Sequence, residues 1–178
     1  MPKIIFITGV CGSGKSSLIP YLKVRLSQKQ FDVHDFDERG VPDGVDREWR
    51  LDETKHWLDL GAINAKRGIS TIITGFSKPD EIRDVLSNNN IEVLFCLLDT
   101  SPNVIRKRLG GRYITEESQE EIKRVSGDTP KKFIEDNALY ASELRKLCKD
   151  WDGHIINTDN LNPEEVATDI VDWVKKMS

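Results

Sequence analysis

The stretch GVCGSGKSSL at residues 9–18 constrains the fold of this chain more than any other feature. It satisfies the pattern G-x-x-x-x-G-K-[ST]: Gly9 opens the pattern, and Gly14, Lys15 and Ser16 close it. A β-branched apolar run precedes the stretch, and leucines at helical spacing follow it. The sequence therefore predicts a strand, a glycine-rich turn and a helix in direct succession.

The predicted turn, residues 9–16, has the composition of a phosphate loop, and we use that name for it below. Its glycines let backbone N–H groups curl around the phosphates of a nucleotide, and the positive end of the following helix points at the same place. Lys15 would reach the phosphate oxygens, and the hydroxyl of Ser16 would ligate Mg²⁺. Cys11 is either a small filler or a reactive thiol in electropositive surroundings. The residues that we expect to hold the nucleotide are Gly9, Cys11, Gly12, Ser13, Gly14, Lys15, Ser16 and Ser17.

Strand-like and helix-like segments alternate along the whole chain. The strand-like runs contain few polar positions, which indicates burial on both faces and hence a parallel sheet covered by helices. With no repeat or linker between them, residues 1–178 are expected to form one α/β domain. After the first run at residues 4–7, the strand-like runs are 31–37, 69–76, 91–99 and 153–159.

Charge and cysteine content exclude several other classes of protein. Lys and Arg total 26 against 30 Asp and Glu, and the signs are mixed along the chain, so neither a nucleic acid nor a membrane surface is expected as a partner. The 3 cysteines lack the spacing of a disulfide framework or a zinc site. The apolar run near the N-terminus is too short for a secretion signal or a membrane span. We expect a cytoplasmic monomer or homodimer.

Two further features accompany the phosphate loop. Asp35 and Asp37 follow the second predicted strand, and Arg108 and Arg112 have R-x-x-x-R spacing on a predicted helix. With these residues the sequence resembles the small P-loop kinases of the adenylate-, shikimate- and gluconate-kinase type. The resemblance implies a three-layer P-loop NTPase sandwich, a five-stranded parallel sheet in the order 2-3-1-4-5, a small helical lid, and the use of ATP with Mg²⁺.

The two aspartates match the D-x-D of shikimate- and gluconate-type kinases. Two residues apart on a strand, their side chains would project to one face. On that likeness Asp35 serves the metal, and Asp37 accepts the proton of the attacking hydroxyl. The alternative is a polar strand end that caps the following turn.

The resemblance also assigns an acceptor-binding region at about residues 38–60, which we call the acceptor region. Its Arg39 and Arg50 would meet an anionic or hydroxylated substrate, and Trp49 and Trp57 would line an apolar wall or serve packing alone. The stretch TGFSK at residues 74–78 aligns with D-G-F-P-R of adenylate kinases. This alignment adds Gly75 and Lys78 to the expected acceptor contacts.

Residues 113–130 are charged and poor in apolar residues, and they correspond to the lid of these kinases, so we call them the lid segment. The arginine pair that precedes the lid segment would act on the nucleotide, Arg108 along the adenine or the phosphates and Arg112 on the transferring phosphoryl. The alternative for these residues is a solvated surface helix.

Lys15, Asp37 and Arg112 are therefore the expected catalytic residues of a phosphotransferase that moves the γ-phosphoryl of ATP to a hydroxyl of a small molecule. Adenylate kinases use an acid and an arginine of the D-G-F-P-R motif for a nucleotide acceptor, and here Thr74 replaces the acid and Lys78 replaces the arginine. Because these replacements weaken the match, a nucleoside or nucleoside monophosphate kinase is the second hypothesis. A nucleotide-binding regulatory ATPase is the third.

Overall fold

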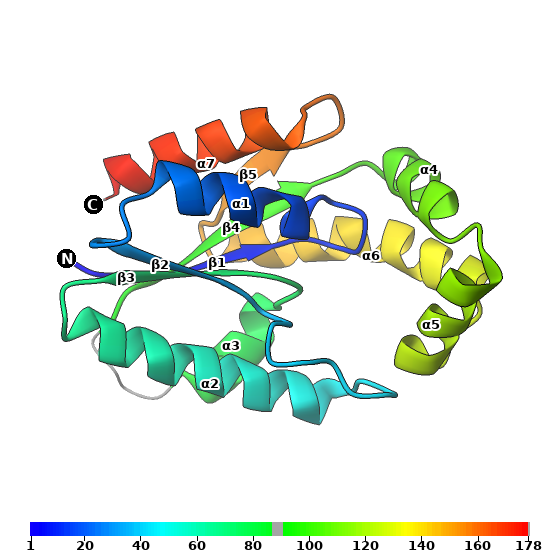
Figure 1. Ribbon diagram of the computed structural model, residues 1–178, viewed down its shortest axis with the longest axis horizontal. Helices are drawn as coiled ribbons and strands as arrows, with labels where there is room; N and C mark the ends of the chain where they lie inside the picture. Colours follow the sequence, from blue (N-terminus) through cyan, green and yellow to red (C-terminus); the bar gives the residue numbers. More distant parts are fainter. Residues whose placement is uncertain (87–90, 178) are drawn as a thin grey trace.

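Five parallel strands form a sheet in the order β2-β3-β1-β4-β5, which confirms the order expected for a small P-loop kinase. The computed structural model describes residues 1–86 and 91–177. Helices cover both faces of the sheet, so the expected three-layer α/β architecture is also confirmed (Figure 1). The strands are β1 Ile4–Thr8, β2 Phe31–Asp35, β3 Ser70–Thr74, β4 Val93–Asp99 and β5 His154–Asn157.

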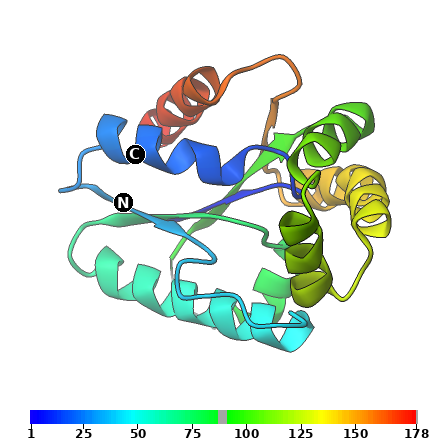
Figure 2. The ribbon, with the colours of Figure 1, turned by 45° about the vertical axis from the view of Figure 1, so that its right-hand side comes forward.

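The helices divide into four groups. Helices α1 and α7 lie together on one face of the sheet, whereas α2 and α3 lie on the other face, and α6 packs against β4 and β5. Helices α4 and α5 stand beyond the carboxyl ends of the strands (Figure 2). None of the helices in the described part of the chain is long and apolar enough to cross a membrane. The bounds are α1 Lys15–Arg25, α2 Arg47–Ala65, α3 Pro79–Val85, α4 Pro102–Arg112, α5 Glu116–Ser126, α6 Pro130–Asp150 and α7 Pro163–Lys176.

Side-chain alternation along β1 divides the core between the two faces of the sheet. Every residue of β1 is buried. Ile5 and Ile7 join the apolar cluster that also contains Leu22 of α1, whereas Phe6 joins the cluster that contains Trp57 of α2. Because β1 lies between β3 and β4, the phosphate loop leaves the sheet at the middle of its carboxyl edge.

In the sequence, a capping residue precedes a proline at Ser101-Pro102, Thr129-Pro130 and Asn162-Pro163, a pattern that predicts a helix start. Pro102, Pro130 and Pro163 are the first residues of α4, α6 and α7. A proline costs no hydrogen bond at this position, because the first backbone N–H of a helix has no partner within the helix. Before α7, Asn162 and Glu165 form a complete capping box, as their spacing predicts.

The second strand is shorter than the sequence indicated. We expected a strand over residues 31–37, but β2 ends at Asp35 and residues 36–39 form a turn. The N–H of Phe36 still donates to the carbonyl of Thr74 at 3.0 Å, which ties the start of the turn to β3. Asp37 therefore lies in a turn, and strand alternation does not determine the direction of its side chain.

Replacement of Leu22 by alanine tests the core between α1 and the sheet. Leu22 is fully buried, so we expect Leu22→Ala to lower the free energy of unfolding in urea by about 2–5 kcal/mol. The matched control is Leu139→Ala on α6, whose leucine is 68% exposed and whose loss should change stability by less than about 0.5 kcal/mol. Equal effects of the two substitutions would contradict this description of the core.

Candidate active site

The phosphate loop is built by close backbone contacts and by glycines with positive φ. A Cβ on Gly9 would lie 2.4 Å from the hydroxyl oxygen of Ser13 and 3.0 Å from the carbonyl of Leu98, so only glycine fits there. Gly12 and Gly14 have φ values of 84° and 102°, a conformation that disfavours residues with a Cβ. Gly14 is also the N-cap of α1 and offers no side-chain acceptor, so no side chain caps the first N–H groups of this helix.

Lys15 projects back over the loop. Its ammonium group donates a hydrogen bond to the carbonyl of Val10 at 2.9 Å. Burial lowers the pKa of Lys15, and the carboxylates of Asp37 and Asp35 act against that lowering. Because these charges influence one another, the lysine of the phosphate loop and both aspartates share one electrostatic environment.

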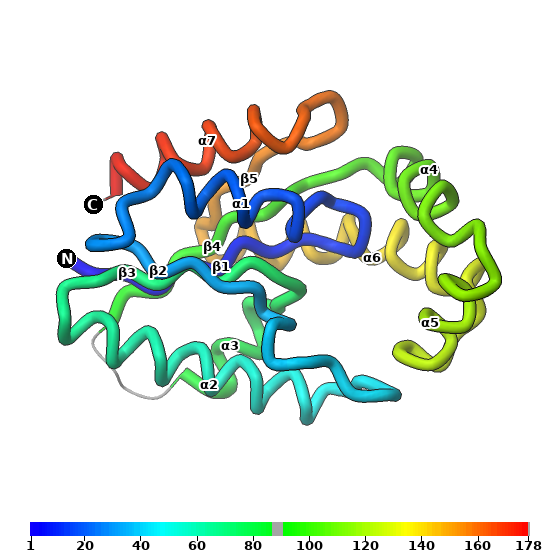
Figure 3. Tube along the Cα trace, in the orientation of Figure 1, coloured from blue at the N-terminus to red at the C-terminus, as the bar shows by residue number. Residues whose placement is uncertain are grey.

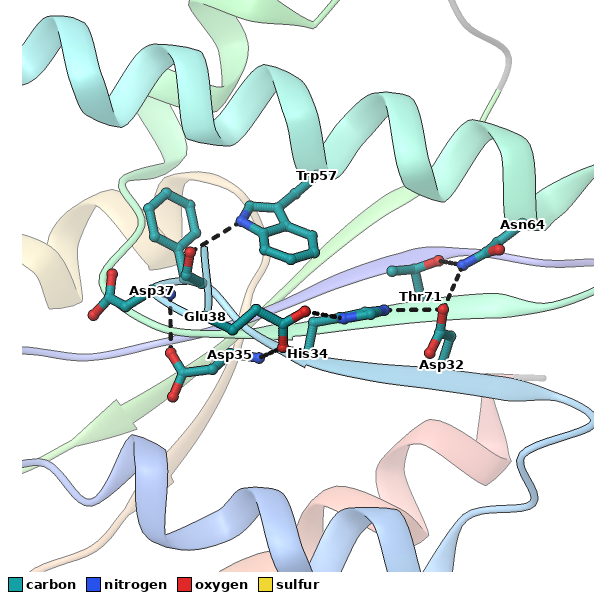
Figure 4. Close-up of polar contacts among 9 residues, drawn as sticks. Asp32, His34, Asp35, Asp37, Glu38, Trp57, Asn64 and Thr71 are labelled. Atoms are coloured by element: carbon teal, nitrogen blue, oxygen red, sulfur yellow. Dashed lines mark hydrogen bonds and ion pairs between the residues drawn. The ribbon is translucent and has the colours of Figure 1, made fainter. Parts of the chain in front are cut away.

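Asp35 and Asp37 belong to the segment 35–39, which we call the carboxylate turn. The N–H of Asp37 donates to Oδ1 of Asp35 at 3.0 Å, a contact drawn in Figure 4. Burial raises the pKa of Asp37, and the neighbouring charge of Asp35 raises it further. The expected pair of carboxylates is thus together and close enough to Lys15 for both charges to act on its pKa, although a turn rather than a strand brings the pair together.

Close packing with β3 holds the carboxylate turn in place. A Cβ on Gly75 would lie 2.1 Å from the Cβ of Phe36, so the turn approaches the end of β3 as closely as glycine allows. The indole N–H of Trp57 donates to the carbonyl of Phe36 at 3.1 Å. Trp57 is only 1% exposed, so of its two expected roles the structure supports packing. Gly75 permits the close approach of the turn, and its contact with an acceptor stays a prediction.

The arginine pair of α4 faces the phosphate loop. Arg108 donates to the carbonyl of Gly12 at 3.3 Å and to the carbonyl of Thr158 at 2.8 Å, so it links the loop to the segment after β5. Arg112 is exposed, and its guanidinium lies 4.0 Å from the sulfur of Cys11. The hydroxyl of Tyr113 lies 3.6 Å from the same sulfur.

A cavity of about 250 Å³ adjoins the phosphate loop. The loop, α4 and the segment after β5 each contribute to its wall, so it lies where Arg108 makes its two hydrogen bonds. Its polar lining includes Ser17 and Thr158, and its apolar lining includes Leu109 and Leu161. A mixed lining of this kind suits a flat aromatic group attached to phosphates.

Two of the three arginines in the acceptor region, Arg39 and Arg50, pair through hydrogen bonds with buried carboxylates. Arg39 donates to Oε1 of Glu53 at 3.0 Å, and Arg50 makes two hydrogen bonds to Glu81, at 2.8 and 3.0 Å. The other oxygen of Glu53, Oε2, is buried and has no hydrogen-bond partner among the residues that the structure describes. These pairs fix the two guanidinium groups and offset their charge.

Lys78 lies among aromatic rings near these pairs. Its ammonium group is 4.9 Å from the ring centroid of Tyr140 and 5.9 Å from that of Phe76. The preceding segment is fixed, because the hydroxyl of Thr8 and the N–H of Ser77 are hydrogen-bonded at 3.1 Å. A compact cation on two π-faces remains able to donate its N–H groups to an acidic ligand.

The lid segment contains α5 and reaches across to the acceptor region. The carbonyls of Arg124 and Val125 accept hydrogen bonds, each of 3.2 Å, from the N–H groups of Gly44 and Val45. Arg124 also forms an ion pair with Asp43. Figure 3 shows the end of α5 beside the segment that precedes α2, so the two regions expected to move and to bind are in contact.

Sequence reasoning missed the partners of the site residues. Glu53 and Glu81 are buried charges on helices, and Glu53 lies on the same stripe of α2 as the two tryptophans, which was an available signal. Asn137 accepts a hydrogen bond from the N–H of Cys11 at 2.9 Å, and no local pattern marks it. Sequence reasoning also assigned no role to His34, whose ring contacts Asp32 and Glu38.

Comparison with known proteins identifies the fold. No protein-family model and no curated protein sequence matches this chain. Among solved structures, an unliganded sugar kinase from Janibacter sp. is 22% identical with a TM-score of 0.62, and covers 98% of this chain and 95% of its own. A shikimate kinase from Acinetobacter baumannii in complex with shikimate is 14% identical with a TM-score of 0.59, covering 100% of this chain and 96% of its own.

An APS kinase from Mycobacterium tuberculosis in complex with AMPPNP and APS extends the comparison. It is 17% identical with a TM-score of 0.62, and covers 98% of each chain. All three structures superpose on this chain over at least 98% of its length, with TM-scores of 0.59 to 0.62. The chain therefore has the fold of the small P-loop kinases.

Thiol labelling tests the placement of the three cysteines. Cys11 is partly exposed in the phosphate loop, whereas Cys96 and Cys148 are buried and burial raises the pKa of both thiols. We expect one thiol per native chain to react rapidly with a disulfide reagent, and all 3 after denaturation. Peptide mapping should assign the fast thiol to Cys11, and rapid labelling of Cys96 in the native protein would contradict the placement.

Proposed function

We propose that this protein is a kinase that transfers the γ-phosphoryl group of Mg²⁺-bound ATP to a hydroxyl of a small molecule. The observation that carries the proposal is the carboxylate turn, which places Asp35 and Asp37 together and close enough to Lys15 for their charges to act on its pKa. A phosphate-binding lysine and a candidate general base thus flank the same space. Solved structures with the same fold are kinases for sugar, shikimate and APS, which supports this reaction class.

In the proposed complex the phosphate loop holds the triphosphate through its backbone N–H groups and through Lys15. Arg108 fixes the loop against the segment after β5, and the adjoining cavity takes the base. The exposed hydroxyl of Ser16 and the carboxylate of Asp35 are oxygen ligands of the kind that Mg²⁺ prefers, and they would hold the ion or its water. Bound Mg²⁺ would offset charge on the phosphate oxygens.

Asp37 is the proposed general base. Its carboxylate would accept the proton of the acceptor hydroxyl as that oxygen attacks the phosphoryl group. Burial and the charge of Asp35 raise the pKa of Asp37, which makes its carboxylate a stronger base than an exposed aspartate. Lys15 and Arg112 would stabilise the charge on the transferring group, and Arg112 is exposed on α4 just before the lid segment.

The charges of the acceptor region favour a hydroxylated acceptor over a phosphate monoester. Arg39 and Arg50 already donate hydrogen bonds to Glu53 and Glu81. Neither guanidinium group is therefore free to bind a phosphate dianion through two parallel hydrogen bonds. Lys78 would take a single acidic group of the acceptor. Closure of the lid segment over these residues would exclude water from the reacting groups.

Substitution of Asp37 by asparagine tests the proposed base. Asparagine keeps the shape but loses the carboxylate, so we expect Asp37→Asn to lower kcat by roughly 10²- to 10⁴-fold with the affinity for ATP nearly unchanged. The acceptor is first found by screening hydroxylated metabolites for acceptor-dependent ADP formation. Asp172→Asn, which changes an exposed aspartate on α7 outside the acceptor region, is the matched control.

Two results would contradict the proposal. Normal turnover by Asp37→Asn with the true acceptor would remove Asp37 as the base. A wild-type enzyme that phosphorylates only nucleoside monophosphates would instead favour the nucleotide kinase, with Lys78 on the acceptor phosphate.

A further inference from the structure

We propose that Glu38 and His34 are positioning residues that hold the carboxylate turn in the geometry needed for phosphoryl transfer. The inference rests on the proposed function, because it concerns the residues that orient Asp35 and Asp37. It is carried by a continuous chain of polar contacts from the core to Asp37, drawn in Figure 4. Neither residue belongs to the phosphate loop or to the acceptor contacts named above.

Glu38 uses both of its carboxylate oxygens within this chain of contacts. Oε2 accepts a hydrogen bond from the backbone N–H of Asp35 at 3.1 Å, and Oε1 lies 2.7 Å from Nδ1 of His34. The side chain thus folds back over the turn to which it belongs. Oδ1 of Asp35 in turn accepts a hydrogen bond from the N–H of Asp37 at 3.0 Å. The contacts of Glu38 therefore also restrict the position of Asp37, the proposed base.

His34 carries this hold into the protein interior. Its second ring nitrogen, Nε2, lies 2.9 Å from Oδ2 of Asp32, and its ring packs against Trp57 with centroids 5.0 Å apart. The same oxygen of Asp32 accepts from the amide of Asn64 at 2.9 Å, and that amide also donates to the hydroxyl of Thr71 at 3.1 Å.

The inner end of the chain of contacts is rigid, whereas its outer end needs support. Asn64 and Thr71 are 5% and 0% exposed, so they anchor the contacts between α2 and β3. Asp35 and Asp37, by contrast, carry like charges that repel each other within one turn. A turn that brings two carboxylates together needs an added hold on its backbone, and Glu38 provides one at Asp35.

A partly exposed Glu–His pair by itself contributes little to stability. The positioning role therefore predicts a change in catalysis without a matching change in folding. A displacement of about 1 Å in a reacting group can cost on the order of 10²-fold in rate. A merely structural pair would instead change the denaturation midpoint and leave kcat as it was.

The test compares Glu38→Ala with Glu38→Gln. Alanine removes both contacts, so we expect kcat to fall by roughly 10- to 100-fold while the KM for ATP changes little. Glutamine keeps an oxygen for the N–H of Asp35 and a donor for a ring nitrogen of His34, so it should restore most of kcat. Glu92→Ala, which removes the exposed ion-pair partner of Lys3 just before β4, is the matched control and should leave kcat unchanged.

The histidine has its own matched pair of variants. His34→Ala breaks the link between Glu38 and Asp32, and it should also lower kcat more than KM. His154→Ala changes a histidine on β5, at the opposite edge of the sheet from β2, and should leave kcat unchanged. Equal losses from the two histidine variants would overturn the assignment of His34.

Amide hydrogen exchange, measured by NMR without substrates, separates failure of this inference from failure of the proposed function. Faster exchange at the amides of Asp35 and Asp37 in Glu38→Ala, with an unchanged denaturation midpoint, supports the positioning role of Glu38 even if no acceptor is phosphorylated. Unchanged exchange at these amides overturns it. Where an acceptor is found, failure of Glu38→Gln to restore kcat above that of Glu38→Ala overturns it as well.

Discussion

The burial of β1 on both faces, between β3 and β4, is the constraint on which the rest of the structure depends. A strand with no exposed face must end in a loop at the middle of the carboxyl edge, and that loop is the phosphate loop. In open parallel sheets, ligands bind at this edge, where the chain crosses to opposite sides. The position of Lys15 follows from this placement before any contact of its side chain is considered.

Close backbone packing then brings the second half of the site to the first. Gly9 permits the phosphate loop to lie against Leu98 of β4, and Gly75 permits the carboxylate turn to lie against the end of β3. Two tight contacts at neighbouring strand ends thus set the separation between the phosphate loop and Asp37. Because these contacts involve the backbone carbonyl of Leu98 and the Cβ of Phe36, which its own backbone holds in place, the arrangement is fixed before a ligand arrives.

Much of this structure could be predicted from the sequence, because local patterns determine it. The glycine pattern, the buried strands and the proline-marked helix starts are each readable within a few residues, and the resemblance to small P-loop kinases supplied the sheet order. The course of the chain at Asp37 was not readable, since the contacts of Phe36 with Thr74, Gly75 and Trp57 end the strand early. Long-range contacts of this kind leave no periodic trace in the sequence.

The pairing of charged residues in the acceptor region could not be predicted from the sequence either. Its arginines were visible in the sequence, but their partners Glu53 and Glu81 lie elsewhere on α2 and on α3, and pairing depends on how these helices pack. A count of basic residues therefore overstated the positive charge available to an acceptor. His34 was equally hidden, because its neighbour Asp32 precedes the carboxylate turn and its neighbour Glu38 lies within it.

The most direct test of the central claim is amide hydrogen exchange with a non-hydrolysable ATP analogue and Mg²⁺. The account predicts that the N–H groups of residues 12–17 exchange more slowly in the complex, since they would donate to phosphate oxygens. It also predicts slower exchange along α5 as the lid segment closes. Unchanged exchange in residues 12–17 at a saturating concentration of the analogue would contradict the claim that this loop binds a nucleotide.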